Sequence, residues 1–384
     1  MNIITENRRF FMSNEIKVSV IMPIYNASDY LRPALECVVG QTLSEIEIIC
    51  IDDGSTDKSL SIIKEYQEKD QRIRIVTENN AGVSTARNKG IIRARGEFIM
   101  FLDADDFYEP TLLERLYVEA IKHELDVAVC KYDVYNTKQS RFTPAVPEDH
   151  GEILMSGEIV SKSNHPEHIL QCMSGYVWNK LFRASLIREK GLMFAPELYV
   201  FEDVHFLCTV LAYAARVKGI SEVLVHHRVY SEQSRSKLFR KYFKQIPKVY
   251  LQIKEFLMSQ GMYIPLTNSY LNLSSSRCYK IYNLLWSDAK ADFWDILHNG
   301  YADSLGWYQH ESFDFENKDV CDFVANVGLY THKQYLKRMD KGRELNIDKM
   351  SKNSLNKKIK SHRFFGRIGA FFKGRRKDSD STAE

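Results

Sequence analysis

Residues 17–132 constrain the fold most, because short apolar runs alternate there with helix-like segments. Each run is rich in Val, Ile or Phe, and the segments between runs carry apolar residues at helical spacing. This alternation predicts βαβ units and an α/β fold with a central, mainly parallel sheet. The five expected strands span 17–23, 46–51, 72–76, 97–102 and 125–130.

Polar residues follow several of these runs at the point where the run ends. Tyr25 and Asn26 follow the first, Asp52 and Asp53 end the second, and D-A-D-D at 103–106 follows the fourth. Ligands of parallel sheets bind beyond the carboxyl ends of the strands, so we expect a site at this edge.

The D-A-D-D motif is a candidate cation site. Asp103 and Asp105 leave an apolar strand two residues apart, and one or two carboxylates with water and phosphates hold Mg²⁺ or Mn²⁺ in nucleotide sites. The alternative is a loop with an aspartate cap before a helix at 110–124. For D-D-G-S-T-D at 52–57 the choice is between a turn and a carboxylate that binds a ribose or a base imide.

Two further groups of residues have two interpretations each, and the spacing of a histidine pair limits what that pair can bind. Arg87 follows a glycine turn and either reaches a phosphate or is solvated on a surface helix. Glu202 and Asp203 open an apolar helix, either as partners of its dipole or with a base facing a cleft. His226 and His227 are neighbours on an expected strand, so they point to opposite faces and cannot bind one metal together.

Several classes of protein are excluded by missing signals. There is no P-loop motif, and the turn after the first strand reads P-I-Y-N-A-S rather than the G-x-G-x-x-G of dehydrogenases. No run of about 18 apolar residues predicts a membrane-spanning helix. The seven cysteines include no C-x-x-C pair, which argues against a disulfide framework or a zinc site and favours a reducing compartment. The first residues lack the apolar core of a secretory signal, and Met12 is a second candidate start.

Taken together, the motifs resemble the family 2 glycosyltransferases, strongly over 17–132 and more weakly to about 235. The segments that carry the resemblance are V-S-V-I-M-P-I-Y-N (18–26), Q-T (41–42), I-D-D-G-S-T-D (51–57), N-A-G-V-S-T-A-R-N-K-G (80–90), G-E-F-I-M-F-L-D-A-D-D (96–106), W-N-K-L-F (178–182) and E-D-V-H-F (202–206). The resemblance implies a GT-A-type nucleotide-sugar-binding domain and an inverting, metal-dependent transfer from a UDP-linked donor. The acceptor would be a hydroxyl of a glycan or a lipid-linked sugar in cell-surface polysaccharide synthesis.

The resemblance also implies roles for single residues. Asp203 would be the catalytic base. Asp105 and Asp103 would bind Mn²⁺ or Mg²⁺. The donor nucleotide would contact Pro23, Tyr25, Asp53, Arg87 and Asp103, and the sugar and acceptor side would be lined by Trp178, Asn179, Lys180 and Glu202.

The chain divides by composition. Residues 1–16 are expected to be flexible, and 17–235 form the glycosyltransferase domain, with a nucleotide-sugar half at 17–132 and an acceptor half at 133–235. Residues 133–165, rich in Pro, Ser, Thr and Asn, predict a long loop, and 236–350 predict an aromatic, helical region.

The tail at 351–384 holds 10 Lys or Arg and 3 Asp or Glu. Its segment 357–377 predicts either an amphipathic helix on anionic lipid or a solvated tail, so the expected location is cytoplasmic, with contact at the inner face of the membrane. A nucleic-acid partner is not expected, because the body is slightly acidic. Two rival functions remain open: a nucleotidyltransferase of related fold, and a non-catalytic nucleotide-sugar-binding scaffold.

Overall fold

The computed structural model describes residues 15–145, 150–229, 239, 241–309 and 316–340. No helix within these ranges is both long and apolar enough to cross a membrane. All seven cysteines lie in described segments and are free thiols. The basic tail and its expected membrane contact lie outside the described residues, as does nearly all of the N-terminus before residue 17.

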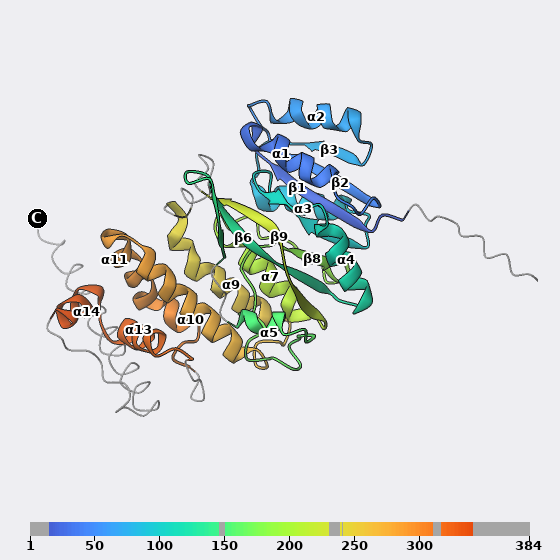
Figure 1. Ribbon diagram of the computed structural model, residues 1–384. Coiled ribbons are helices and arrows are strands. Elements are labelled where there is room, and N and C mark those ends of the chain that lie inside the picture. The colour runs from blue at the N-terminus through green and yellow to red at the C-terminus, as the bar shows by residue number, and fades with distance from the viewer. Residues whose placement is uncertain (1–14, 146–149, 230–238, 240, 310–315, 341–384) are drawn as a thin grey trace, which may run out of the picture.

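The described strands form one sheet in the order β3-β2-β1-β4-β8-β6-β9-β5, with β7 paired to β6 (Figure 1). Strands β1 and β2, β1 and β4, and β2 and β3 pair in parallel, which confirms the predicted parallel sheet. Beyond β4 the sheet is mixed, because β8 runs antiparallel to β4 and β6, whereas β6 and β9 are parallel. The strand bounds are β1 Val18–Ile24, β2 Ile46–Asp52, β3 Ile73–Thr77, β4 Phe98–Phe101, β5 Phe107–Tyr108, β6 Val127–Asn136, β7 Arg141–Pro144, β8 Lys180–Arg183 and β9 Val217–Val229.

Helices cover both faces of the parallel half. Neighbouring strand residues point to opposite faces, and Val20 and Ile21 accordingly belong to two different hydrophobic clusters. The Val20 face is covered by α1 (Ser28–Val39), α2 (Ser59–Lys69) and α4 (Leu112–Lys122). The Ile21 face is covered by α3 (Val83–Arg93), α6 (Ala184–Glu189) and α7 (Glu202–Tyr213). A Cβ at Gly90 would lie 2.3 Å from the Ile21 Cγ2 atom, so glycine lets α3 lie directly against β1.

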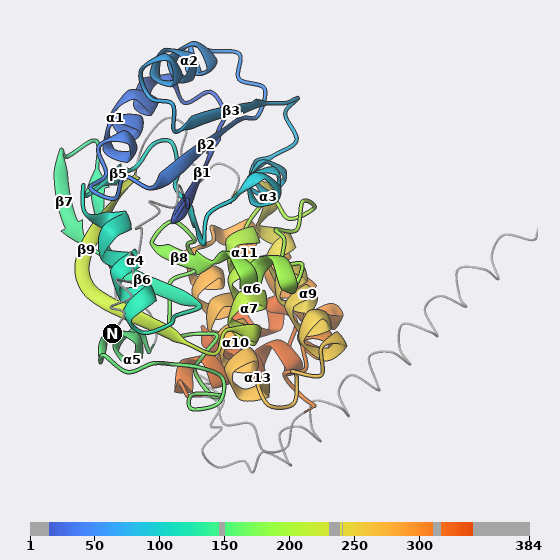
Figure 2. The ribbon, with the colours of Figure 1, turned by 90° about the vertical axis from the view of Figure 1, so that its right-hand side faces the viewer.

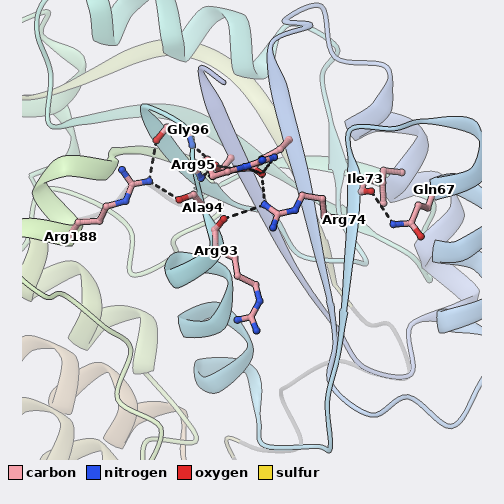
Figure 3. Close-up of polar contacts among 10 residues, drawn as sticks. Gln67, Ile73, Arg74, Arg93, Ala94, Arg95, Gly96 and Arg188 are labelled. Carbon is pink, nitrogen blue, oxygen red and sulfur yellow. Dashed lines mark hydrogen bonds and ion pairs between the residues drawn. The ribbon is translucent and has the colours of Figure 1, made fainter. Parts of the chain in front are cut away.

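The amino ends of the parallel strands are joined by the buried carboxylate of Glu47. Figure 3 shows Arg74, Arg95 and Gly96 at this edge. The Glu47 carboxylate accepts hydrogen bonds from Ser19 Oγ at 2.7 Å, from the Arg95 backbone N–H at 2.7 Å and from Arg74 Nη1 at 2.7 Å. Three strands and the α3–β4 connection therefore share one charged group, which fixes this edge of the sheet.

The segment 133–165 is not the long loop that its composition predicts. Strand β6 continues to Asn136 and turns back as β7, and Gly151–Met155 forms the short helix α5. The hairpin is stabilised by pairing with β6, a long-range contact that residue composition does not reveal. Strand β9 contains His226 and His227, as expected, and extends from Val217 to Val229.

The described part of the C-terminal region is helical, as predicted, and packs through α7 onto the Ile21 face (Figure 2). Its buried aromatic residues, including Tyr250, Tyr270 and Trp294, belong to the same hydrophobic cluster as α7. The helical core therefore supports the helix that carries Glu202 and Asp203. The elements are η1 Phe243–Gln245, α9 Ile246–Ser259, α10 Thr267–Leu284, α11 Ser287–Ile296, η2 Leu297–Tyr301, α12 Ala302–Ser304, α13 Lys318–Leu329 and α14 His332–Met339.

Candidate active site

The carboxyl ends of β1, β2 and β4 meet at one edge of the sheet. Ile24 lies opposite Asp52, and Ile21 lies opposite Phe101. Because these strands end beside one another, the residues that follow them share this edge. The predicted grouping of Tyr25, Asp53 and the D-A-D-D loop at one edge is confirmed.

The loop after β1 presents Tyr25 to solvent. The Tyr25 side chain is 50% exposed, whereas the next residue, Asn26, has a left-handed backbone with φ 48°. This conformation is held by two bonds to the loop after β2: the Asn26 N–H donates to Ser55 Oγ at 3.0 Å, and the Thr56 N–H donates to Asn26 Oδ1 at 2.8 Å. The exposed ring is therefore mounted on a fixed turn. Pro23, two residues earlier, is partly buried within β1.

Asp53 has a structural task at this edge. Its two carboxylate oxygens accept the N–H groups of Ala81 at 2.8 Å and Gly82 at 2.9 Å, so it anchors the loop before α3. The two loops lie so close that a Cβ at Gly54 would be 2.8 Å from the Asn80 nitrogen, and Gly54 itself has φ +75°. The Oδ1 atom of Asp52, by contrast, is buried without a hydrogen-bond partner among the described residues.

Arg87 is the centre of the site. It is fully buried on α3, and its Nη1 atom lies 2.5 Å from Asp203 Oδ1 and 3.3 Å from Glu202 Oε1, while Nη2 lies 3.0 Å from Asp103 Oδ1. Burial alone would lower the pKa of Arg87, but the charges of Asp203, Asp103 and Glu202 raise it above its ordinary value. The alternative of a solvated surface arginine is therefore wrong. The terminal nitrogens bind carboxylates from the loop after β4 and from the start of α7, so Arg87 links these two segments.

The D-A-D-D loop concentrates negative charge. Burial, together with the charges of Asp106 and Asp103, raises the pKa of Asp105 to about 7. Burial also raises the pKa of Asp106, although a hydrogen bond from His227 opposes the shift. Carboxylates crowded in this way fit a hard divalent cation, whose charge would relieve their repulsion. The residues present therefore fit the implied metal.

Two residues at the end of β9 hold this loop. His227 Nδ1 lies 3.1 Å from Asp106 Oδ1, the Arg228 N–H donates to the same oxygen at 2.8 Å, and Arg228 Nε donates to the Asp105 carbonyl at 2.7 Å. Burial would lower the pKa of His227, but the bond to Asp106 and the nearby carboxylates raise it. Sequence reasoning missed Asp106 and Arg228. The run H-H-R near a strand end was the available signal, but it does not show that His227 contacts Asp106, 121 residues away. As predicted, His226 is separated from this group: its ring bonds Asp133 and Glu109 instead.

The W-N-K motif does not line an open surface. Asn179 donates to the Cys130 carbonyl at 2.7 Å, and Lys180 Nζ donates to the Tyr176 carbonyl and to Asn179 Oδ1, both at 2.6 Å. These bonds fix segment 174–180 to β6, and both side chains are buried. Their role on the sugar side stays a prediction. Trp178 is buried too, and its ring stacks on His227 at a centroid distance of 5.1 Å. Trp178 therefore packs against His227, the histidine that contacts Asp106 of the acidic loop.

The acidic pair opens α7 at a strained turn. Phe201, the residue before the helix, has a left-handed φ of 60°, which is an outlier for a bulky residue and typical of functional sites. The Glu202 side chain is 2% exposed and the Asp203 side chain 14%, so Asp203 is the more accessible carboxylate of the two. The structure thus brings Asp203, Arg87 and Asp103 into one connected group from three separate elements.

Comparison with known proteins identifies the family to which the chain is similar. Residues 19–181 match the family described as Glycosyl transferase family 2. The uncharacterized glycosyltransferase EpsJ of Bacillus subtilis is 34% identical over 212 residues, 55% of this chain and 60% of that protein. The putative glycosyltransferase EpsH of the same organism is 32% identical over 272 residues, 68% of this chain and 76% of that protein.

Two further proteins extend the comparison. The poly(ribitol-phosphate) beta-glucosyltransferase of Bacillus spizizenii is 30% identical over 209 residues, 53% of this chain but only 30% of that protein. The crystal structure of S. aureus TarS 1-349 in complex with UDP-GlcNAc superposes with a TM-score of 0.62 at 22% identity, covering 85% of this chain and 89% of that one. This likeness confirms the expected GT-A-type fold.

Proposed function

Because the chain belongs to glycosyl transferase family 2, we propose that this glycosyltransferase moves a sugar from a UDP-linked donor to an acceptor hydroxyl, with inversion at the anomeric carbon. The acceptor would be a glycan or lipid-linked sugar in the synthesis of a cell-surface polysaccharide. Support for the donor comes from the UDP-GlcNAc bound by TarS, and support for the acceptor class comes from the name of the poly(ribitol-phosphate) relative.

One observation carries the proposal: the guanidinium of Arg87 joins Asp103 of the acidic loop to Asp203 at the start of α7. A transferase needs a donor side, where diphosphate leaves, and an acceptor side, where a proton is removed. The two carboxylates are the residues that the family pattern assigns to these sides. A buried ion-pair link between them keeps their separation constant.

On the donor side, the half-exposed ring of Tyr25 would stack on the base. Asp53 would accept from the base imide through lone pairs that the amides of Ala81 and Gly82 leave free. Pro23 would fix the backbone direction at the end of β1 and thereby the position of Tyr25. Arg87 would act as a positioning residue, since its terminal nitrogens already bind carboxylates.

Asp105 and Asp103 would hold the divalent cation, Mn²⁺ or Mg²⁺, with Asp106 behind them. When bound, such a cation offsets the charge that develops on the leaving diphosphate. The contacts of Asp106 with His227 and Arg228 keep the loop shaped for it.

On the acceptor side, Asp203 would take the proton of the attacking hydroxyl. A carboxylate bound to an arginine is a weaker base, but here one guanidinium is shared among three carboxylates, so the group stays net negative. Glu202 is too buried to reach an acceptor and would hold Arg87 in place. One displacement with a base opposite the leaving group inverts the anomeric centre.

The basic tail offers a separate contact. Its excess of Lys and Arg over 351–384 supports peripheral binding to an anionic membrane surface, where a lipid-linked acceptor would lie. Removal of 351–384 should reduce sedimentation with vesicles that contain anionic lipid, and unchanged sedimentation would refute this contact.

The test of the donor site is a thermal-shift panel of nucleoside diphosphates and nucleotide sugars on the full chain, with Mn²⁺ and with EDTA. We expect UDP and one UDP-sugar to raise the melting temperature only with the cation. That UDP-sugar is then used in transfer assays, and the anomeric configuration of the product is read by NMR. No shift with any nucleotide, or a retained configuration in the product, would contradict the proposal.

A further inference from the structure

A second cluster of metal-ligating side chains lies away from the acidic loop. His150 immediately precedes α5, His168 lies in the turn region before β8, and Glu316 lies just before α13. Among the described residues, these are the three whose ligand atoms all lie within 4.8 Å of one another. Segments that are far apart in sequence therefore present three ligands to one point.

The geometry is close to that of a metal site. His150 Nε2 lies 2.7 Å from Glu316 Oε2, and His168 Nδ1 lies 3.3 Å from Glu316 Oε1. Ligands about 2.0–2.1 Å from a tetrahedral Zn²⁺ are separated from one another by roughly 3.4 Å. Small side-chain rotations would bring the three atoms to that spacing.

Hydrogen bonds alone leave this cluster incomplete. The two imidazole rings stack with centroids 4.1 Å apart and planes at 23°, an arrangement that two protonated rings would oppose. His168 Nδ1 is buried and has no hydrogen-bond partner among the described residues, although it lies 3.3 Å from Glu316 Oε1. His150 also has a left-handed backbone with φ 59°, a strained conformation that ligand sites often retain.

The carboxylate is held from behind by the helical region. Asn272 of α10 donates through Nδ2 to Glu316 Oε1 at 3.3 Å and accepts from the Glu316 N–H at 3.4 Å. Such partners behind a ligand fix its orientation and contribute to metal affinity. The side chains of His150, His168 and Glu316 are 26%, 29% and 34% exposed, so an ion can reach the cluster from solvent.

We propose that His150, His168 and Glu316 bind Zn²⁺ and thereby fasten the α5 segment to the helical region. Two imidazoles with one carboxylate favour zinc, whereas the all-carboxylate loop at Asp103–Asp106 favours Mg²⁺ or Mn²⁺. The sequence argues against a zinc site because its cysteines lack metal spacing, whereas these two histidines are 18 residues apart and Glu316 lies far along the chain. The role is structural, and no catalytic step depends on it.

The test uses the full chain carrying Asp105→Asn, so that the acidic loop does not contribute metal binding. Protein stripped with EDTA and dialysed is titrated with Zn²⁺, and bound metal is measured by elemental analysis together with the melting temperature. We expect one Zn²⁺ per chain and a higher melting temperature, with no matching shift from Mg²⁺. The variant His168→Gln should bind Zn²⁺ more than about 10-fold more weakly, and Asn272→Ala should weaken it by about 10-fold.

His165→Gln is the matched control. His165 lies three residues away, but its ring contacts Glu158 rather than Glu316, so this variant should bind like its parent. If His168→Gln does not fold, His150→Gln gives the same comparison, with circular dichroism as the check of folding. Absence of Zn²⁺ from the folded parent, or equal affinity in the His168→Gln and His165→Gln variants, would overturn the proposal.

Discussion

The two ends of the same parallel strands place carboxylates in opposite electrostatic environments. At the amino ends, Glu47 is buried, but donors from Ser19, Arg74 and Arg95 surround it. Burial would raise the pKa of Glu47, and these hydrogen bonds lower it below its ordinary value instead. At the carboxyl ends, burial and neighbouring carboxylates raise the pKa of Asp105 to about 7.

The opposite pKa shifts of Glu47 and Asp105 suggest that one end of the sheet contributes to stability and the other to ligand binding. An acid with more donors than it needs stabilises the folded chain, whereas crowded acids destabilise it unless a cation or a ligand neutralises them. We therefore propose that the amino ends form the structural edge and that the carboxyl ends form the edge at which ligands bind. If the two edges have separate roles, a change at the Glu47 edge alters stability and not UDP binding. A change at the carboxyl edge alters UDP binding or turnover without lowering stability.

The largest expected effect is on turnover. Asp203→Asn keeps the shape of the side chain and its contact with Arg87 but removes the base, so we expect kcat to fall by about 10³-fold. Donor affinity, measured by calorimetry with UDP and Mn²⁺, should change less than about 3-fold, because the acidic loop is intact. Wild-type turnover in this variant would remove Asp203 from the mechanism.

Next in size is a loss of stability at the structural edge. Glu47→Gln leaves Arg74 and Arg95 without their shared carboxylate, and we expect the free energy of unfolding to fall by about 2–3 kcal/mol. Donor affinity should be unchanged, since the substitution lies at the opposite end of the strands. Urea denaturation at pH 7 gives the first quantity and UDP titration the second.

The stability that Glu47 contributes should depend on pH with a known sign. Its pKa is lower in the folded chain than its ordinary value of 4.5, so the contribution is complete above that pH. It is lost as the pH falls through the folded pKa. The difference in unfolding free energy between wild type and Glu47→Gln should therefore shrink below about pH 4.5, and a difference that grows there would contradict the pairing.

The smallest expected effect is at the exposed ring. Tyr25→Ala should weaken UDP binding by about 10-fold, the effect of losing one aromatic stack on a base. The free energy of unfolding should change by less than about 0.5 kcal/mol, because half of the ring is already exposed. Tyr25→Phe is the matched control and should bind UDP like wild type.

The parallel half, and the grouping of Tyr25, Asp53 and the acidic loop at its carboxyl edge, could be predicted because their signals are local. The first strands are apolar runs such as 18–24, and the turn and acidic residues that follow them are adjacent in sequence. The parallel register then brings those residues together without further information.

Residues whose role depends on distant partners could not be predicted in this way. The sequence leaves Arg87 either solvated or phosphate-binding, because the residues beside it in the chain do not reveal the three carboxylates that it contacts in the fold. The sequence does not show that Asn179 and Lys180 are buried, because their hydrogen-bond partners lie on β6 and in the preceding loop. The hairpin of β6 and β7 was hidden by a loop-like composition.

The account is tested most directly by one variant, Asp105→Asn, measured in two ways. Replacing the central acid of the crowded loop should raise the free energy of unfolding in EDTA at pH 8 by about 1 kcal/mol, because a disfavoured charge is removed. The same change should weaken Mn²⁺-dependent UDP binding by at least about 10-fold. Lower stability together with unchanged UDP binding would contradict the account, because this edge would then resemble the edge at Glu47.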